Sequence, residues 1–232
     1  MATRFYLPQS GSLPAGFSAP ALMAGWDTTD LSEPHVDLST KTYLTGTTNS
    51  VMDPINNATS SQKYIPFRRY YSDPLIAQTI SAQAIKAQIM AIEEAISGNY
   101  FFTLSVRAVR LDGGAITGTI LAISTGATEI DITNENRAFS GTTSSLAINE
   151  NDRLEITIGA SGNPSTTDIY VAVQTQDAIG NSGDLPENET LSSMDYNPWV
   201  EFANNLIFVG SPNANNQPIS HATPGLAPVM GV

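Results

Sequence analysis

The middle of the chain alternates between apolar and polar residues with a period of two. In 101–111 (FFTLSVRAVRL), every second residue from Phe102 to Ala108 is apolar, and Thr, Ser and Arg stand between them. Successive side chains of a strand point to opposite faces, so this alternation predicts a strand with one buried face. The turn residues 112–114 (DGG) follow, and 115–123 (AITGTILAI) alternates again. The pattern therefore predicts a β-hairpin around this turn.

Other short stretches of the same kind predict further strands. Residues 153–159 (RLEITIG) alternate most sharply, which places Leu154 on a buried face and Glu155 on a solvated one. The aromatic stretch 63–71 contains Pro66 and is typical of an edge strand or an irregular lead-in. The remaining predicted strands are 129–133, 145–148, 168–175 and 198–209. Short strands separated by turns predict an all-β fold, a single antiparallel β-sandwich of jelly-roll-like type.

Residues 77–98 fit two patterns. Isoleucines at 85, 89, 92 and 96 have helical spacing, and Gly98 is a natural end for a helix. The stretch 80–90 also alternates as a strand does. Periodicity and propensity taken alone favour the helix, so both structures remain open from the residues themselves.

Long segments rich in proline and glycine flank the predicted sandwich. We expect an extended N-terminal arm over 1–60, the sandwich over 61–209 and an extended C-terminal arm over 210–232. The N-terminal arm carries large aromatic residues, which disordered tails usually lack. It is therefore predicted to dock them on its own sandwich or on a neighbouring subunit, and the candidate partner-interface anchors are Phe5, Tyr6, Phe17 and Trp26.

Composition narrows the possible partners. The chain has 22 acidic and 10 basic residues, and its net charge of −12 repels phosphate, so we expect no nucleic-acid partner. The basic doublet Arg68-Arg69 is expected to contact an acidic neighbour. The chain has no cysteine, which excludes disulfides and thiolate sites. It has no apolar run of about 18 residues and no apolar signal-peptide core, so we expect no membrane association and no Sec-type export.

The residues suited to acid–base catalysis form no recognisable constellation. Both histidines, His35 and His221, lie in the arms, which would hold an imidazole poorly. The carboxylates that could form a pair fall mostly at turns or on outward-facing strand positions: Glu93, Glu94, Asp131, Glu135, Glu150, Asp152, Glu155 and Asp177. A sugar hydrolase would need two of them facing each other across a cleft. Because no pair is singled out, the chain is predicted not to be an enzyme.

Two kinds of binding site remain as alternatives. The oxygen-rich loops 134–136, 149–152 and 184–189 could hold a structural calcium ion, although turns capped by Asn and Asp side chains explain them more simply. No other cofactor is expected. Tyr170 and Tyr196 are candidate glycan contacts, because aromatic rings stack on sugars in carbohydrate-binding modules.

Four stretches together resemble small structural proteins of tailed bacteriophages: MATRFYLP, SVRAVRLDGGAITGTILAI, NENDRLEITIG, and DLPENET with DYNPWVEF. The resemblance implies a jelly-roll-like virion protein attached to the capsid, neck or tail, and it implies no catalytic residues. It also favours a strand over 79–92, because the stretch before the central hairpin looks like a strand in such proteins.

The expected function is that of a non-enzymatic structural component of a tailed-phage virion. We expect such a chain to assemble through its arms with other virion proteins and with copies of itself. The alternative is a carbohydrate- or receptor-binding module of a phage fibre or tail, with a host surface glycan as its ligand.

Overall fold

The computed structural model describes residues 2–9, 11–28, 36–39, 50–57, 63–93, 99–162, 169–176, 183–192 and 196–210. These residues form thirteen strands and no helix, so none of them forms a helix able to span a membrane. The strands are β1 (Thr3–Tyr6), β2 (Val36–Ser39), β3 (Ser50–Asn57), β4 (Lys63–Tyr71), β5 (Gln78–Ile80), β6 (Ala84–Glu93), β7 (Tyr100–Val109), β8 (Ile116–Glu129), β9 (Glu135–Thr142), β10 (Leu146–Ile148), β11 (Arg153–Gly162), β12 (Ile169–Gln176) and β13 (Trp199–Phe202).

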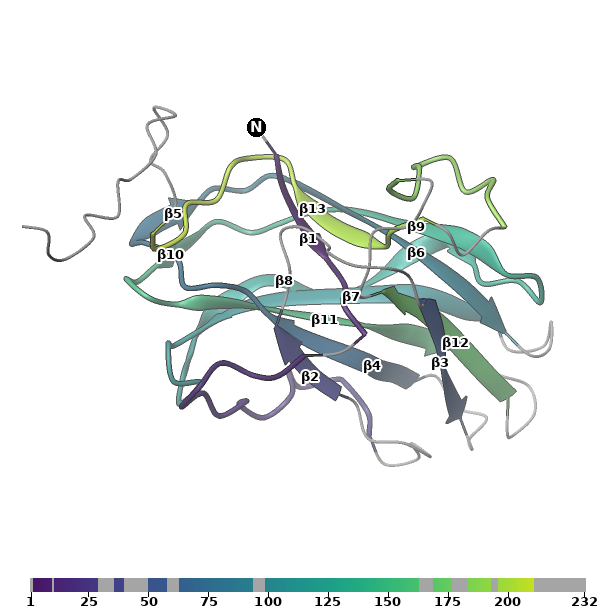
Figure 1. Ribbon diagram of the computed structural model, residues 1–232, viewed down its shortest axis with the longest axis horizontal. Helices are drawn as coiled ribbons and strands as arrows, with labels where there is room; N and C mark the ends of the chain where they lie inside the picture. The colour runs from purple at the N-terminus through teal and green to yellow at the C-terminus, as the bar shows by residue number, and fades with distance from the viewer. Residues whose placement is uncertain are drawn as a thin grey trace, which may run out of the picture.

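The strands pack as two layers (Figure 1). One sheet has the order β1-β13-β6-β12-β3, with β9 paired to the other edge of β6. The second sheet has the order β2-β4-β11-β7-β8, and a short β5–β10 ladder closes one end. The pairings are antiparallel except for β2 with β4. The prediction of an all-β antiparallel sandwich is confirmed.

The central hairpin forms where the alternation predicts it. β7 pairs with β8, and their register closes at Val109 and Ile116. In the turn, the Gly114 amide donates to Asp112 Oδ1 at 2.9 Å, and Gly113 has a φ of 77°, which favours glycine. Several register shifts interrupt the β7–β8 ladder and increase its local twist.

Over its described residues, the ambiguous segment 77–98 forms two strands, β5 and β6, which residues 81–83 separate, so the strand interpretation is confirmed with one interruption. β6 is central to its sheet: β9 lies along one edge, and β13 and β12 follow one another along the other. Ile85 and Ile89 are both fully buried on the inner face. Residues four apart share a face in a strand as well as in a helix, so their spacing could not separate the two structures.

Two predicted strands differ from the structure. The prediction of a strand over 129–133 is wrong beyond Glu129, where β8 ends and the Ile130 amide donates to the Tyr100 carbonyl at 2.7 Å. The strand predicted over 198–209 is shorter, because β13 ends at Phe202. The Asn204 amide then donates to the Gln83 side chain at 2.6 Å, which turns the chain away from the sheet.

β4 explains why a proline is tolerated in a sheet. Pro66 lies opposite Gly159 of β11, beside a register shift, and β2 pairs only with the later part of β4, from Arg68 to Tyr71. The proline therefore sits where β4 has one neighbour, as expected of an edge position.

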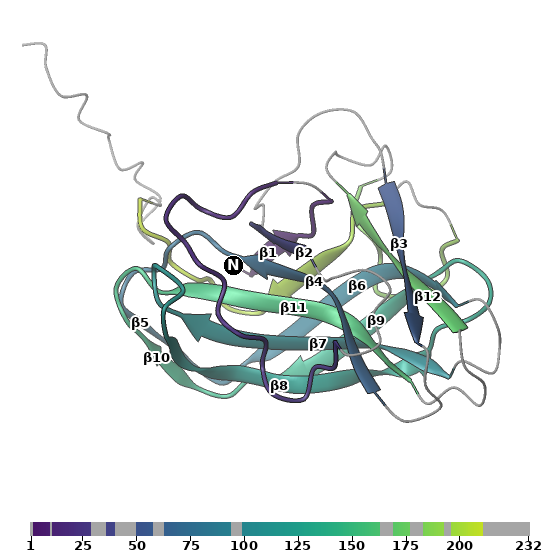
Figure 2. The same cartoon turned by 90° about the horizontal axis from the view of Figure 1, so that it is seen from below.

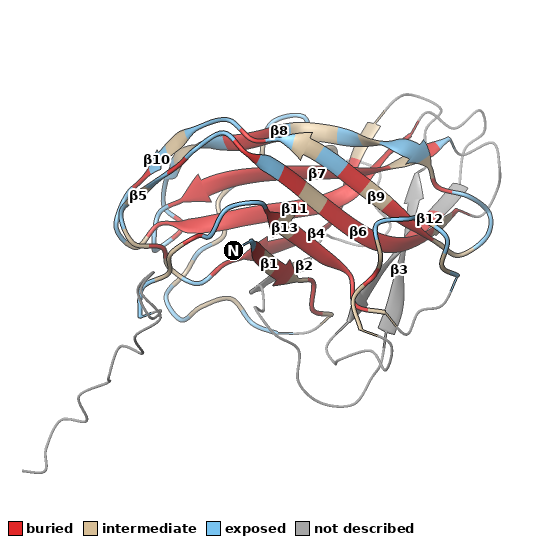
Figure 3. Cartoon of the chain, turned by 90° about the horizontal axis from the view of Figure 1, so that it is seen from above, coloured by how far each residue is buried: buried red, intermediate tan, exposed pale blue. Residues whose placement is uncertain are grey.

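The core lies between the two sheets and is lined by their inward-facing residues. The Phe102 and Phe139 rings pack edge to face across it at 6.4 Å, joining β7 to β9. Figure 3 shows the buried positions running along β6, β7 and β11. All ten residues of β11 are buried, although the sequence predicts one solvated face for this strand.

The N-terminal region explains the double burial of β11. Within the predicted arm 1–60, β1, β2 and β3 join the two sheets, and residues 11–28 cross the outside of the second sheet without forming a strand. Figure 2 shows this purple segment passing over β11, β7 and β8. The prediction that Glu155 is solvated is wrong: its residue exposure is 1%, because the segment covers that face. Residues 211–232 of the predicted C-terminal arm lie outside the described residues.

Substitution of Gly159 tests the close packing of β11 against β4 and against Trp26 of the N-terminal segment. A Cβ atom at this position would overlap the Ile65 carbonyl oxygen and lie 2.6 Å from the Trp26 ring. We expect Gly159→Ala to lower the free energy of unfolding by about 1–3 kcal/mol, the usual cost of overpacking, as measured by urea denaturation. Gly114→Ala is the control, because its Cβ would meet only the movable Asp112 side chain. Equal stability of the two variants would contradict this packing.

Candidate functional site

The covered side of the second sheet is polar. We call it the outer face and define it by the side chains that β4, β7 and β11 direct away from the core: Arg69, Tyr71, Ser105, Arg107, Glu155 and Thr157. Their neighbours in sequence point inward and form the apolar core. The alternation in the sequence thus divides the two faces correctly, but the polar face is buried under residues 11–28 rather than exposed to water.

A network of charged groups occupies the centre of the outer face. Arg107 forms a bidentate ion pair with Glu155, with Nε at 2.7 Å and Nη2 at 2.8 Å from its two carboxylate oxygens. The Tyr71 hydroxyl donates to the same carboxylate at 3.1 Å. Arg69 lies beside it and forms a second bidentate pair with Asp37 of β2, at 2.6 and 2.9 Å. The acidic neighbour predicted for the arginine doublet therefore includes a residue of the same chain.

Burial governs the protonation of this network. It raises the pKa of the Glu155 carboxyl, and the ion pair with Arg107 opposes that shift. Burial also raises the pKa of Tyr71, and the nearby Glu155 carboxylate raises it further. The Tyr71 phenol therefore stays a hydrogen-bond donor. The network is a fixed scaffold that orients two guanidinium groups.

The oriented guanidinium groups hold the main chain of the N-terminal segment. Arg69 Nη1 donates to the Pro20 carbonyl at 2.5 Å, and Arg107 Nη2 donates to the Ala21 carbonyl. Carbonyl oxygens are common to every residue, so these bonds recognise the path of an extended chain rather than its side chains. The outer face is thus built to hold an extended polypeptide.

Two aromatic side chains of the N-terminal segment also contact the outer face. Trp26 is 8% exposed, and its Nε1 donates to Ser105 Oγ at 2.9 Å. The Phe17 ring lies 4.5 Å from the Tyr71 ring, centroid to centroid. These contacts bury apolar area that the polar face itself does not supply.

Main-chain bonds fix the segment at two further points. The Ser18 amide donates to the Asp112 carbonyl at 2.9 Å, and the Asp27 amide donates to the Tyr64 carbonyl at 2.8 Å. Gly113 allows the first contact, because a Cβ atom there would overlap the Ser18 carbonyl. The central hairpin turn is therefore also part of the docking surface.

The four predicted arm anchors contact their own chain. Phe5 of β1 is fully buried and packs edge to face on Phe202 at 6.1 Å. The Tyr6 hydroxyl donates to Asp184 Oδ2 at 3.0 Å, while Phe17 and Trp26 lie on the outer face. The sequence predicts docking on the chain's own sandwich or on a neighbouring subunit, and the structure shows the first of these. A contact of these residues with a partner stays a prediction.

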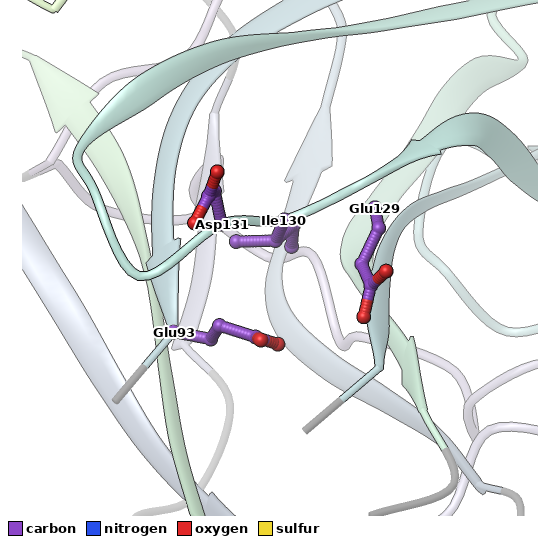
Figure 4. A pocket seen from close by; sticks show the side chains of 4 residues that line it. All are labelled: Glu93, Glu129, Ile130 and Asp131. Carbon is purple, nitrogen blue, oxygen red and sulfur yellow. The ribbon is translucent and has the colours of Figure 1, made fainter. Parts of the chain in front are cut away.

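A second site is an acidic pocket of about 130 Å³ at the opposite end of the sandwich from the β5–β10 ladder. It is lined by Glu93 at the end of β6, by Glu129 at the end of β8, and by Ile130 and Asp131. Figure 4 shows Glu93 and Glu129 extending into the space between the two strands, whereas the Asp131 carboxyl points away from it. Two predicted candidates, Glu93 and Asp131, thus line the same pocket, while Glu129 is not among the predicted candidates.

Glu93 is the chemically distinctive group of this pocket. It is 2% exposed, and its Oε2 accepts a hydrogen bond from the Tyr100 amide at 3.3 Å. Burial raises the pKa of Glu93 to about 7, and the neighbouring Glu129 and Asp131 contribute to the shift. The pocket can therefore take up or release a proton near neutral pH.

The carboxylates of the oxygen-rich loops are engaged by protein donors. Asp152 Oδ2 accepts hydrogen bonds from Thr117 and Asn149, and Asp184 accepts hydrogen bonds from Arg4 and Tyr6. These are the capped turns and ion pairs that explain such loops without a metal ion. The described residues contain no group of three His, Cys, Asp or Glu side chains able to hold one. A structural calcium ion stays a prediction.

Two of the remaining candidate carboxylates, Glu150 and Glu135, lie in the part of the chain that the structure describes. Glu150 accepts a hydrogen bond from the Ala77 amide at 2.8 Å, and Glu135 forms an ion pair with Arg137 at 3.0 Å. The other candidates for acid–base chemistry lie outside the described residues: Glu94, Asp177, His35 and His221.

The two predicted glycan contacts lie in different parts of the fold. Tyr170 belongs to β12 and is paired with Asn56, but its side chain lies outside the described residues. Tyr196 is half-buried and packs against a small core cluster that contains Trp199. Trp199 is buried, and the Arg4 guanidinium stacks on its ring at 4.1 Å. A glycan contact at either tyrosine stays a prediction.

No protein-family model matches the chain, and no curated protein sequence matches it. Among solved structures, the chain is similar to an aminopeptidase from the marine sediment archaeon Thaumarchaeota archaeon, with a TM-score of 0.42 and 10% identity over 89% of this chain and 37% of that one. It is also similar to a structure of infectious bursal disease virus, Gx strain, with a TM-score of 0.24 and 9% identity over 67% of this chain and 35% of that one.

A third similar structure is the Eiger TNF of S. frugiperda, with a TM-score of 0.23 and 11% identity over 59% of this chain and 99% of that one. The chain spans little more than a third of the length of the first two proteins. The virus neighbours also include the VP2 subviral particle of infectious bursal disease virus, at a TM-score of 0.24. Likenesses at these TM-scores carry no argument about function.

Arg107 tests the charged network. We expect Arg107→Ala to lower the free energy of unfolding by about 3–5 kcal/mol, because the Glu155 carboxylate stays buried without its ion-pair partner. Urea denaturation measures the change. Lys86→Ala is the control, since its ion pair with Glu187 is exposed and is worth less than about 1 kcal/mol. A loss for Arg107→Ala no larger than for the control would show that the network does not stabilise the fold.

Glu93 predicts a pH dependence of stability. The pKa of Glu93 is about 7 in the folded chain and 4.5 for a free side chain. Between these two pH values the folded state therefore holds a proton that the unfolded state has released. The contribution of Glu93 to stability is therefore lost as pH rises through this range. We expect Glu93→Gln to stabilise the chain relative to the wild type by about 1–3 kcal/mol at about pH 8 and by little at about pH 5.

Urea denaturation at a series of pH values measures this difference. Glu187→Gln, at an exposed ion pair, controls for the loss of one negative charge. Parallel pH profiles of the wild type and Glu93→Gln would contradict the assignment of the titrating group.

Proposed function

We propose that the chain is a non-enzymatic structural component of a virus particle, and specifically of a tailed-phage virion. In this role it assembles with other particle proteins and with copies of itself through its extended terminal segments. Its place in the particle is on the capsid, the neck or the tail.

One observation carries the proposal: the outer face holds an extended polypeptide by its main chain. Arg69 and Arg107 donate to the consecutive carbonyls of Pro20 and Ala21. The Glu155 carboxylate orients the Arg107 guanidinium for this contact. A face of this kind is useful to a protein that binds extended chain segments, which is how neighbouring proteins in an assembly are commonly linked.

Two further features support the proposal. The sequence resemblance to small phage structural proteins spans the start of the chain and the sandwich, including the hairpin turn that contacts Ser18. The all-β sandwich also suits the role, because its edges and loops leave large surfaces for contacts with neighbours.

Deletion of the N-terminal segment is not a clean test of its role in assembly. A deletion of residues 1–40 would remove the buried Phe5 and Leu7 from the core and would uncover the Glu155–Arg107 ion pair. Loss of assembly in such a variant would then follow from damage to the fold. The test therefore uses the intact chain.

We expect the intact chain to be present in purified particles at a fixed copy number relative to the other particle proteins. Particles from an infected culture are banded on a density gradient, washed in high salt and quantified by mass spectrometry. An abundant soluble host protein measures carry-over. Recovery of the chain only in particle-free fractions, or at the level of the host protein, would overturn the proposed function.

A further inference from the structure

We propose that residues 2–28 are an exchangeable segment that docks on the outer face and on the β13 edge of a second copy of this chain. The inference deepens the proposed assembly function, on which it rests, by naming a second copy as the partner. Four features of the structure support it.

The segment is a separable unit. β1 pairs with β13 over four residues, and residues 11–28 later follow the outer face. Within the described part, the internal main-chain bonds of the segment are two turns, Phe17 to Pro14 and Trp26 to Met23. Its side chains and carbonyls also form hydrogen bonds with the rest of the chain, at Asp184, Ser105 and Arg69 among others. A second copy presents an identical set of partners, so exchange replaces each contact with its equivalent.

The receiving surface is compatible with water. The outer face carries Arg107 and Glu155 at its centre, with Ser105 and Thr157 beside them. When the segment leaves, these polar groups regain solvent, whereas exposure of the opposite, apolar face would be far more costly. The main loss on opening is the burial of Phe5 and Leu7 in the core and of Trp26 on the outer face, and docking on the second copy restores it.

Recognition depends on the path of the main chain. The carbonyls of Pro20 and Ala21 are held by arginines, and the amide of Asp27 is held by a carbonyl. The close approach of the Ser18 carbonyl to Gly113 requires a segment of this shape. These contacts select an extended chain with the correct path, which the same segment of another copy provides.

Opposite charges fix the register at both ends of the segment. Arg4 in β1 forms ion pairs with Asp184 at 2.6 Å and Glu201 at 2.8 Å. At the other end, Asp27 pairs with Lys63 at 3.3 Å. A chain of net charge −12 repels its copies in general, so these local attractions favour docking in a single register.

An interchain disulfide tests the exchange directly, because the chain has no cysteine of its own. Arg4 of β1 and Glu201 of β13 lie directly opposite each other in the antiparallel register. Opposite residues of this kind have Cα atoms about 4.5–5.5 Å apart, which is within the range of about 4.4–6.8 Å that a disulfide needs. Both side chains are partly exposed, at 29% and 21%.

We expect a mixture of the Arg4→Cys and Glu201→Cys chains to form a mixed disulfide dimer under mild oxidation. The yield should be several-fold above the homodimers that either variant forms alone, and it should rise with concentration from about 1 µM to about 1 mM. Mass-tagging one variant identifies the mixed dimer on a non-reducing gel. Arg4→Ser with Glu201→Ser checks by thermal melting that loss of the ion pair leaves the chain folded.

The double variant Arg4→Cys/Glu201→Cys shows whether the two positions can be bridged. Oxidised at low concentration, it should give a closed monomer that stays monomeric in sedimentation at concentrations where the reduced form associates. If it closes but the mixture forms no mixed dimer above the homodimer level, the exchange is overturned. If it does not close, a wild-type chain that sediments as a monomer throughout the same range overturns it.

The two proposals fail differently. A chain that is present in particles but does not exchange in solution keeps the assembly function and loses the second copy as its partner. A chain that exchanges but is absent from particles keeps the self-association and loses the virion role.

Discussion

The buried ion pair between Arg107 and Glu155 is the interaction on which the outer side of the molecule depends. It joins β7 to β11 and is covered by the N-terminal segment. A buried pair of charges is tolerated only when its remaining donors and acceptors are satisfied. Tyr71 satisfies the carboxylate, and the Ala21 carbonyl satisfies the guanidinium. The segment and the charged pair therefore stabilise each other, and neither is a separate feature of the fold.

This mutual dependence explains why the second sheet is buried on both sides while only one side is apolar. The inner face excludes water by packing, as at Phe102 and Phe139, and the outer face excludes it by hydrogen bonds to a covering chain. The second arrangement can open at lower cost, because its polar groups regain water. A surface of that kind suits a protein that exchanges or shares extended segments during assembly.

Two of the buried carboxyls, Glu155 and Glu93, have different surroundings. Glu155 faces a bidentate arginine and a tyrosine hydroxyl, so its charge has partners. Glu93 receives one amide hydrogen bond and faces further acidic groups, so its neutral form is favoured up to about pH 7. Glu155 therefore links β7 and β4 to β11 through its ion pair and hydrogen bond, whereas Glu93 makes the far end of the sandwich sensitive to pH.

The alternating pattern determined the sheet class, the β7–β8 hairpin and the division of β11 into polar and apolar sides, because a strand's two faces follow directly from residue order. It did not determine what covers the polar side, so Glu155 was assigned to solvent. It also could not bring Glu93 and Glu129 together, or choose between strand and helix for Ile85 and Ile89. Those outcomes depend on contacts between residues far apart in the chain, and only the packed sandwich decided them.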